Sequence, residues 1–319
     1  MDTLLSAFMG PAVQFQIRLV NADPGAAGRP PKRVTYANGG GEDLVVFKGA
    51  ETVAGEVTVI PTRSGRVDHI GIKVELVGLI QPVYAGGGMT PFEFMQHVRE
   101  LEPPGSLDSV RAHKFRFDDV DKPHESYEGL NVRLRYFVRV TVSRSMAANV
   151  FKEQDMWVVN VPPPPAPDVV VPPIRSQVGI KNCLTIEVEW AKERFHLREI
   201  IFGKVTFLQV RVKIAKMKVA LVRKEKTGMG ENAAVTNETL MARGDSFAQY
   251  EVMDGCPVMG EVVPVRLFLS HYDGLTPTYK NVSQHFSVRY FLNVIIIDEM
   301  NRRYFKHEEI FLYRRDAVC

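Results

Sequence analysis

Thirteen residues near the middle of the chain, Val161–Pro173, constrain its fold more than any other stretch. Seven of them are proline, in the order V-P-P-P-P-A-P-D-V-V-V-P-P. Proline has no backbone N–H to donate and fixes φ near −65°, so this run cannot form a helix or a central strand. We expect an extended polyproline II connector at ~3.1 Å per residue, about 40 Å from end to end. The chain is therefore expected to have two parts, residues 1–160 and 174–319, with the connector at 161–173.

Three segments before the connector recur after it in the same order. V-A-G-E-V-T-V (53–59) matches I-F-G-K-V-T-F (201–207), I-K-V-E-L-V (72–77) matches M-K-V-A-L-V (217–222), and L-R-Y-F-V-R-V (134–140) matches V-R-Y-F-L-N-V (288–294). The offsets of 148, 145 and 154 residues differ only as loop lengths would. Short strands draw on few residue types, so one match alone would mean little. Three matches in order indicate an internal duplication.

Apolar and polar residues alternate in most segments on both sides of the connector, for example over Val13–Leu19 and Asn131–Ser143. This period of two is typical of strands with one buried face. Many short strands of this kind predict two antiparallel β-sandwiches in tandem. Gly55, inside one such segment, would mark a β-bulge. Arg133, Arg135 and Arg139 fall on one strand face; we interpret them as solvated or paired with carboxylates, with binding of phosphate or an acidic partner as the alternative.

One segment departs from the strand pattern. In T-P-F-E-F-M-Q-H-V-R-E-L, Thr90 suits a helix N-cap, and proline and glutamate follow at the positions a capping box favours. Phe94, Val98 and Leu101 then recur at helical spacing before Pro103-Pro104-Gly105. The pattern predicts one short helix in the N-terminal half.

The composition narrows the classes of function. Lysine and arginine exceed aspartate and glutamate by only 40 − 37 = 3, which does not indicate nucleic acid as the main partner. No apolar run approaches the ~18 residues of a membrane span, and the first residues lack the basic region of a secretory signal. We expect a cytoplasmic protein.

The chain also lacks the patterns of catalytic and metal sites. We find no nucleophile elbow, phosphate-binding loop, dinucleotide fingerprint or zinc-protease motif. The carboxylates near Asp118–Asp121 lack the spacing of a calcium loop, so we interpret them as a solvated turn. Cys183, Cys256 and Cys319 form neither a disulfide framework nor a metal-ligand set, and we expect Cys183 and Cys256 to be small buried residues. No enzymatic activity, cofactor or metal is expected.

A methionine-bearing turn stands out in S-F-A-Q-Y-E-V-M-D-G-C-P-V-M-G-E (246–261). Val252, Met253, Val258 and Met259 surround an Asp-Gly pair and a proline. Methionine-bearing turns often form adaptable contact surfaces. The alternative is an ordinary hairpin whose apolar residues point inward.

Strings throughout the chain resemble the arrestin-like small subunit of retromer, the endosomal cargo-sorting coat. They include F-K-G-A-E-T-V-A-G-E-V (47–57), K-P-H-E-S-Y-E-G-L-N-V-R-L-R-Y-F-V-R (122–139), V-G-I-K-N-C-L-T-I-E (178–187), Y-E-V-M-D-G-C-P-V-M-G-E (250–261) and R-R-Y-F-K (302–306). The resemblance implies an arrestin fold without enzymatic activity, in a cytoplasmic protein recruited to the cytosolic face of endosomes through its partners.

The same resemblance implies three protein partners. The C-terminal sandwich would dock on the large α-solenoid subunit through the Y-E-x-M-D-G segment, which assigns that contact to Tyr250, Val252 and Met253. A phox-homology sorting nexin would bind near the junction of the sandwiches. Cytosolic tails of membrane cargo would add along a strand edge there, with their apolar side chain in a pocket matched by Val178 and Phe305.

Other functions remain open at this point. The chain could be the arrestin-like subunit of a retromer-related coat or an arrestin-like receptor adaptor. A β-sandwich lectin or enzyme is a further alternative, against which the lack of clustered carboxylates and histidines argues.

Overall fold

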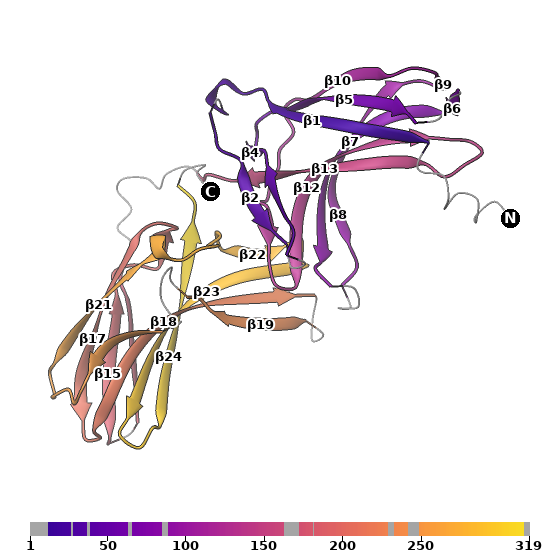
Figure 1. The fold of residues 1–319 in the computed structure, drawn as a ribbon. Coiled ribbons are helices and arrows are strands. Elements are labelled where there is room, and N and C mark those ends of the chain that lie inside the picture. Colours follow the sequence, from indigo (N-terminus) through magenta and orange to yellow (C-terminus); the bar gives the residue numbers. More distant parts are fainter. Residues whose placement is uncertain are drawn as a thin grey trace. The chain divides into compact units, whose positions relative to one another are not determined.

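The computed structural model describes residues 12–26, 28–36, 39–62, 66–84, 89–162, 172–180, 182–228, 233–241 and 249–315. These residues divide into two compact units between Asn160 and Val161, both built almost entirely of strands (Figure 1). Most of the proline connector, residues 163–171, lies outside the described residues, as does Cys319.

The first unit is a β-sandwich of a three-stranded and a six-stranded sheet. The smaller sheet has the order β1-β5-β10, and the larger has β4-β13-β12-β7-β8 with β11 beside β12. Two short two-stranded sheets, β2-β3 and β6-β9, complete the unit. The elements are β1 (Val13–Asn21), η1 (Pro24–Ala26), β2 (Lys32–Thr35), β3 (Gly41–Leu44), β4 (Val46–Lys48), β5 (Val53–Pro61), β6 (Val67–His69), β7 (Gly71–Pro82), β8 (Phe92–Glu102), β9 (Gly105–Leu107), β10 (Arg111–Phe117), β11 (Tyr127–Glu128), β12 (Val132–Ser143) and β13 (Val150–Val159).

The second unit repeats this plan with one additional strand in each of its two sheets. Its sheets have the orders β14-β15-β17-β21 and β16-β24-β23-β18-β19, with β20 beside β18 and β22 beside β23. The elements are β14 (Ile174–Ile180), β15 (Leu184–Trp190), β16 (Arg194–His196), β17 (Ile200–Val210), β18 (Ile214–Thr227), β19 (Ala234–Thr239), β20 (Tyr250–Asp254), β21 (Val262–Phe268), η3 (Leu269–His271), β22 (Tyr279–Val282), β23 (Phe286–Asp298) and β24 (Arg303–Tyr313).

The three repeated segments occupy equivalent places in the two sandwiches. β12 pairs with β7 so that Phe137 faces Val77, and β23 pairs with β18 so that Phe291 faces Val222. These residues differ by the same offsets of 154 and 145 that relate the repeated segments. In both units a three-residue strand then adds in parallel, β4 to β13 and β16 to β24. Equal registers follow directly from a duplicated chain.

In each sandwich a buried tyrosine forms hydrogen bonds with the backbone of a preceding loop. The Tyr136 hydroxyl donates to the carbonyl of His124 at 2.8 Å and accepts its N–H at 3.2 Å. The Tyr290 hydroxyl accepts the N–H of Thr276 at 3.1 Å. Both side chains are fully buried. In both units the phenol therefore fixes the preceding loop to the strand.

The predicted helix is wrong: Phe92–Glu102 is strand β8, antiparallel to β7. Register shifts between Ile72 and Lys73 and between Gly78 and Leu79 leave Phe94 and Leu101 without cross-strand partners. Two bulges therefore displace the apolar residues from a period of two to spacings of four and three, which resemble a helical stripe. The Phe94 ring lies over Gly78, where an added Cβ would come within 2.5 Å of it. Pairing with β7 and this contact override the local capping signals.

Two smaller predictions are also wrong. The registers of β1 and β10 against β5 are continuous at Gly55, so there is no bulge there. Glycine is required because the Phe115 ring would lie 2.6 Å from a Cβ at this position. Cys183 and Cys256 are exposed rather than buried. Both lie in turns between strands, where the alternation that buries a strand residue does not apply.

Candidate functional site

The segment expected to dock a partner is an edge strand with a bulge. Among the described residues, β20 pairs only with β18. Met253 lies opposite Met217 and Glu251 opposite Lys218, so Val252 has no cross-strand partner. A bulge of this kind re-aims a side chain and increases the local twist. Val252 and Met253 are both half-buried.

The third predicted docking residue anchors this strand. The ring of Tyr250 lies edge-on to that of Tyr272, with centroids 6.3 Å apart. Edge-on aromatic pairs are worth about 0.5–1.5 kcal/mol beyond their buried area. Tyr250 therefore fixes the start of β20 while the bulge re-aims the apolar residues that follow.

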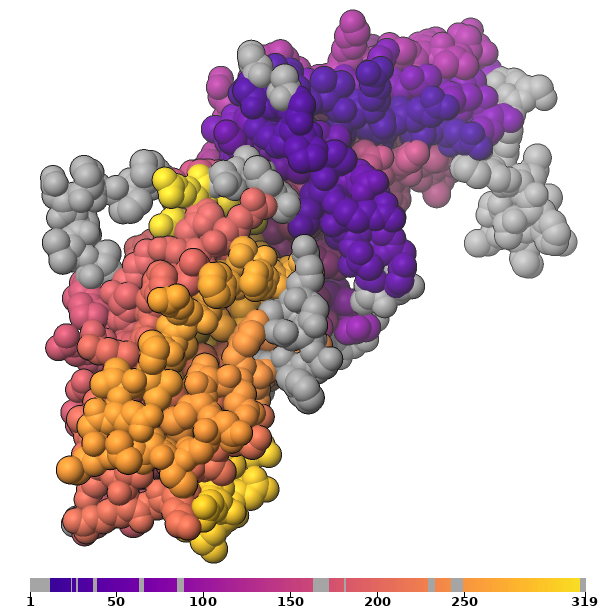
Figure 2. Space-filling model, turned by 60° about the vertical axis from the view of Figure 1, so that its left-hand side comes forward, coloured from indigo at the N-terminus to yellow at the C-terminus, as the bar shows by residue number. Residues whose placement is uncertain are grey.

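The turn after β20 holds two apolar side chains in solvent. The Gly255 N–H donates to the Ala215 carbonyl at 3.0 Å, and the Gly260 N–H donates to the Phe207 carbonyl at 2.7 Å. Between these anchors, Val258 is 67% and Met259 73% exposed. This part of the chain lies on the surface of the second unit (orange in Figure 2). The inward-pointing alternative is wrong for these two residues, and a fixed turn with exposed apolar tips is typical of a contact surface.

Val178 and Phe305, the two residues matched to a cargo pocket, line one small hollow in the second unit. Its volume is about 160 Å³, and it lies between β14 and β24. Leu184, Ile186 and Val294 form much of its apolar wall. A cavity of this size and lining accepts one aliphatic side chain rather than a whole ligand.

Phe305 lies at the edge of this hollow and projects to the outer face of its sheet. Tyr304 and Lys306 alternate with Phe305 along β24, so they project to the inner face of the sheet and Phe305 to the outer face. The Phe305 ring is 49% exposed and stacks on His307, with centroids 6.4 Å apart. Phe305 therefore borders the hollow at its rim.

The strands beside this hollow have unpaired edges. β14 is the last strand of its sheet, and it pairs only with β15 among the described residues. Within the part of the chain that the structure describes, β24 pairs with β16 only at Phe311–Tyr313, so the earlier part of β24 has one open side there. Open edges present backbone N–H and C=O groups that an extended peptide can pair with.

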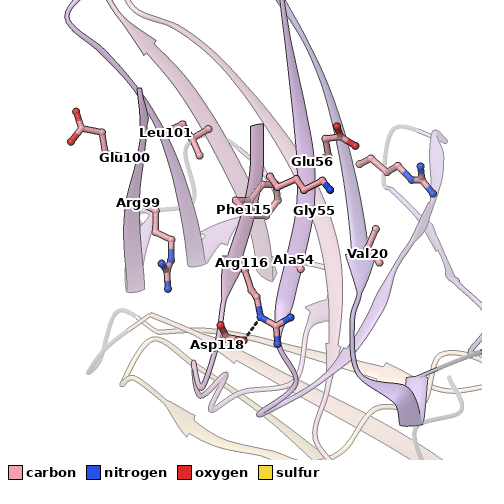
Figure 3. Close-up of a pocket in the computed structure, with 12 residues that line it drawn as sticks. Val20, Ala54, Gly55, Glu56, Arg99, Glu100, Leu101, Phe115, Arg116 and Asp118 are labelled. Carbon is pink, nitrogen blue, oxygen red and sulfur yellow. Dashed lines mark hydrogen bonds and ion pairs between the residues drawn. The ribbon is translucent and has the colours of Figure 1, made fainter. Parts of the chain in front are cut away.

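The smaller sheet of the first unit carries a larger hollow of about 770 Å³ on its outer face (Figure 3). Ala54 forms a shallow floor, while Arg18 and Lys114 lie on either side of Glu56 in the strand register. Arg116 turns toward Asp118 and binds it at 2.6 Å (Figure 3). Charges of both signs are interleaved here, so this hollow does not favour one sign of ligand.

The prediction that the arginines of β12 are paired with carboxylates is confirmed. Arg133 binds Asp155 at 2.7 Å, and Arg139 binds Glu153 at 2.9 Å. Arg135 contacts both carboxylates. These side chains are mostly buried, so the network is a structural feature of the first unit.

The acidic turn before β11 is held by hydrogen bonds. Asp118 accepts from Arg116 at 2.6 Å and from the Thr52 hydroxyl at 3.0 Å. Glu125 is buried and accepts the Asn160 N–H at 3.2 Å. Across the described ranges, no group of three or more histidine, cysteine or acidic residues is arranged to hold a metal ion. No helix in the same ranges is long and apolar enough to cross a membrane.

Two tandem antiparallel β-sandwiches define an arrestin-like, all-β protein. The model of the family described as vacuolar protein sorting-associated protein 26 matches residues 9–301. The chain belongs to this family.

Curated relatives agree with the family match. The chain is 47% identical over 286 residues to vacuolar protein sorting-associated protein 26 of Dictyostelium discoideum, covering 89% of this chain and 78% of the relative. It is 41% identical over 316 residues to protein 26B of Arabidopsis thaliana, covering 98% of both chains. It is 40% identical over 310 residues to protein 26B of Homo sapiens, covering 97% and 87%. The similarity therefore extends over both sandwiches.

Proposed function

We propose that this chain is a non-enzymatic adaptor subunit of a retromer coat that works in vacuolar protein sorting at the cytosolic face of endosomes. The observation that carries the proposal is the β20 segment, an edge strand whose bulge and following turn present apolar side chains from a fixed backbone. The curated relatives are named for vacuolar protein sorting, which supports the same role.

In this proposal Tyr250, Val252 and Met253 bind the large α-solenoid subunit. Val258 and Met259 extend the contact, because they continue the apolar surface in solvent. Apolar residues at the centre of an interface account for most of its binding energy, while the polar rim contributes less. The partner is expected to offer an apolar groove between helices.

The hollow between β14 and β24 would receive the aliphatic side chain of a cargo tail, with a phox-homology sorting nexin as the third partner. Backbone pairing along an open strand edge would supply affinity that does not depend on the side chains of the cargo tail. The hollow of about 160 Å³ would supply selectivity. Membrane association would come from these partners rather than from an insertion of this chain.

The docking assignment is tested by Val252→Asp combined with Met253→Asn. We expect co-purification with the solenoid subunit to be lost, because burying new charge in an interface costs several kcal/mol. Val235→Asp is the matched control: Val235 lies on β19, which flanks the same side of β18, and is exposed. Circular dichroism should show all three proteins folded. Undiminished binding of the double variant in calorimetry would refute the assignment.

The cargo pocket is tested by Phe305→Ser in the assembled coat. We expect weaker binding of a cargo-tail peptide carrying an aromatic-x-(Leu/Met) motif, because the rim of the hollow loses its apolar contact. Phe151→Ser is the control, since Phe151 is the counterpart of Phe305 in the first unit and is 60% exposed. Equal peptide affinity for the Phe305 variant and the unchanged protein would rule out this pocket.

A further inference from the structure

The two units differ in charge at one equivalent place on their larger sheets. In the first unit this place is the start of β12 with its neighbours β11 and β13. Arg133 binds Glu128 at 2.9 Å and Asp155 at 2.7 Å, and Arg135 binds Glu153 at 2.9 Å. Two cations therefore meet three carboxylates, and the surface neutralises itself.

The second unit replaces most of these carboxylates with other residues. The registers align Glu153 with His307 and Asp155 with Glu309. Glu128 corresponds to Lys280 because each follows the tyrosine that pairs at the same place, Tyr127 with Leu134 and Tyr279 with Val288. On the neighbouring strand, lysines replace uncharged residues: Leu79 aligns with Lys224 and Gln81 with Lys226. Arg135 aligns with Arg289, which keeps its charge. Four permanently charged cations therefore surround one carboxylate, Glu309. They are Lys224, Lys226, Lys280 and Arg289.

That carboxylate is already engaged. Arg289 donates to Glu309 through two nitrogens, one of them at 2.6 Å. Lys226 and Lys280 are exposed, and no carboxylate of the described residues lies within ion-pair distance of either. The Lys280 ammonium lies 4.1 Å from the centre of the Phe311 ring, which holds it at this place. At this place the described residues of the second unit therefore carry more positive than negative charge, whereas those of the first unit do not.

Three of these four cations line a hollow of about 770 Å³. Lys226, Lys280 and Arg289 reach it from β18, β22 and β23, and Asn281, Gln284 and Ser287 supply further hydrogen-bonding groups. Hollows that bind small molecules in proteins are commonly about 300–1,000 Å³. Cations that converge from three strands fit a compact anion better than an extended acidic peptide, which would need a linear groove.

We propose that this hollow binds a compact, multiply phosphorylated anion of the inositol phosphate class, free in solution or as the head group of a lipid. Phosphate oxygens accept charge-assisted hydrogen bonds from lysine and arginine, and several phosphates on one ring match several converging cations. The site goes beyond the proposed coat function, since it needs neither the solenoid subunit nor cargo.

The first unit supplies the design of the test. Lys226→Gln with Lys280→Glu gives the second unit the residues that the first unit has at the equivalent positions, Gln81 and Glu128. Binding of inositol hexakisphosphate to the full chain is measured by calorimetry. We expect the double variant to bind at least roughly tenfold more weakly, since each charge-assisted contact is worth about one factor of ten. Lys213→Gln, an exposed lysine of the same unit outside the hollow, should bind as the unchanged protein does.

Vesicles of phosphatidylcholine, with and without a phosphatidylinositol bisphosphate, distinguish the two sources of the ligand. Binding to the charged vesicles that the double variant loses assigns a lipid head group, and binding to the free compound alone assigns a soluble ligand. Equal binding by the double variant, an equal loss with Lys213→Gln, or no binding of either probe would overturn the proposal. Tighter binding of a doubly phosphorylated peptide than of either probe would also overturn it.

Discussion

A single buried carboxylate organises the turn between β4 and β5. Glu51 accepts two hydrogen bonds from Arg29 at 2.8 Å, one from Asn21 at 2.8 Å and one from the Lys48 N–H at 2.7 Å. Burial alone would raise the pKa of Glu51, but hydrogen bonds from Arg29, Lys48 and Asn21 outweigh it and lower the pKa from 4.5 to about 2. In the second unit, Glu199 accepts the His196 N–H in the same way at 2.8 Å.

Because the pKa of Glu51 is lower in the folded state, its contribution to stability is present above about pH 4.5 and is lost as the pH falls toward 2. We expect Glu51→Gln to reduce the free energy of unfolding by about 3 kcal/mol near neutral pH, since Arg29 keeps a buried charge without its partner. The difference from the unchanged protein should shrink as the pH falls from 4.5 toward 2, because over this range the carboxyl takes up a proton in the unfolded state but not yet in the folded state. Urea unfolding across this pH range measures it.

Glu299→Gln is the control for this measurement. Glu299 is also paired with a lysine, Lys213 at 3.6 Å, but both side chains are more than half exposed. Exposed ion pairs contribute about 0–1 kcal/mol, so this change should be nearly neutral. A loss in Glu51→Gln that stays constant down to pH 2 would contradict the assigned pKa.

At the scale of elements, the sequence predicted the regular strands and missed the irregular ones. The alternation over Val13–Leu19 and Asn131–Ser143 corresponds to β1 and β12, because both strands keep one register along their length. β8 was predicted as a helix because bulges at Phe94 and Leu101 imitate a helical spacing. A bulge depends on the partner strand, and a single segment does not encode its partner.

The residues of the candidate functional site were also predicted only in part from the sequence. Methionine and valine around an Asp-Gly pair indicated the exposed turn near Met259 from composition alone. Val178 and Phe305 were assigned only through the family resemblance, since residues so far apart carry no local signal of a shared hollow. The bulge at Val252 and the cationic hollow near Lys280 were not predicted, because both arise from the alignment of neighbouring strands.

The packing of β17 against β15 makes a further prediction. A Cβ added to Gly203 would lie 2.3 Å from the ring of Trp190, which is fully buried. Gly203→Ala should therefore destabilise the protein by about 1–3 kcal/mol in urea unfolding, the usual cost of overpacking. Gly105→Ala is the control, since the nearest atoms to its added Cβ are 3.7 Å away. Equal stability of the two variants would refute the tight contact.

At the scale of the molecule, one duplicated sandwich has diverged into two surfaces. The first unit neutralises the face of its larger sheet with ion pairs among Arg133, Arg135 and three carboxylates. The second unit has the additional strand β14, the bulged strand β20 and a hollow lined by three cations and one carboxylate. We therefore expect specific binding to concentrate on the second unit, while the shared cores keep both units folded.

Hydrogen–deuterium exchange of the full chain, with and without the solenoid subunit, tests this account most directly. Strand edges and turns exchange quickly until a partner covers them. We expect binding to slow exchange at residues 250–262, while β8, an edge strand of the first unit, should exchange at an unchanged rate. Unchanged exchange at 250–262 in a complex that demonstrably forms, with protection elsewhere, would contradict it.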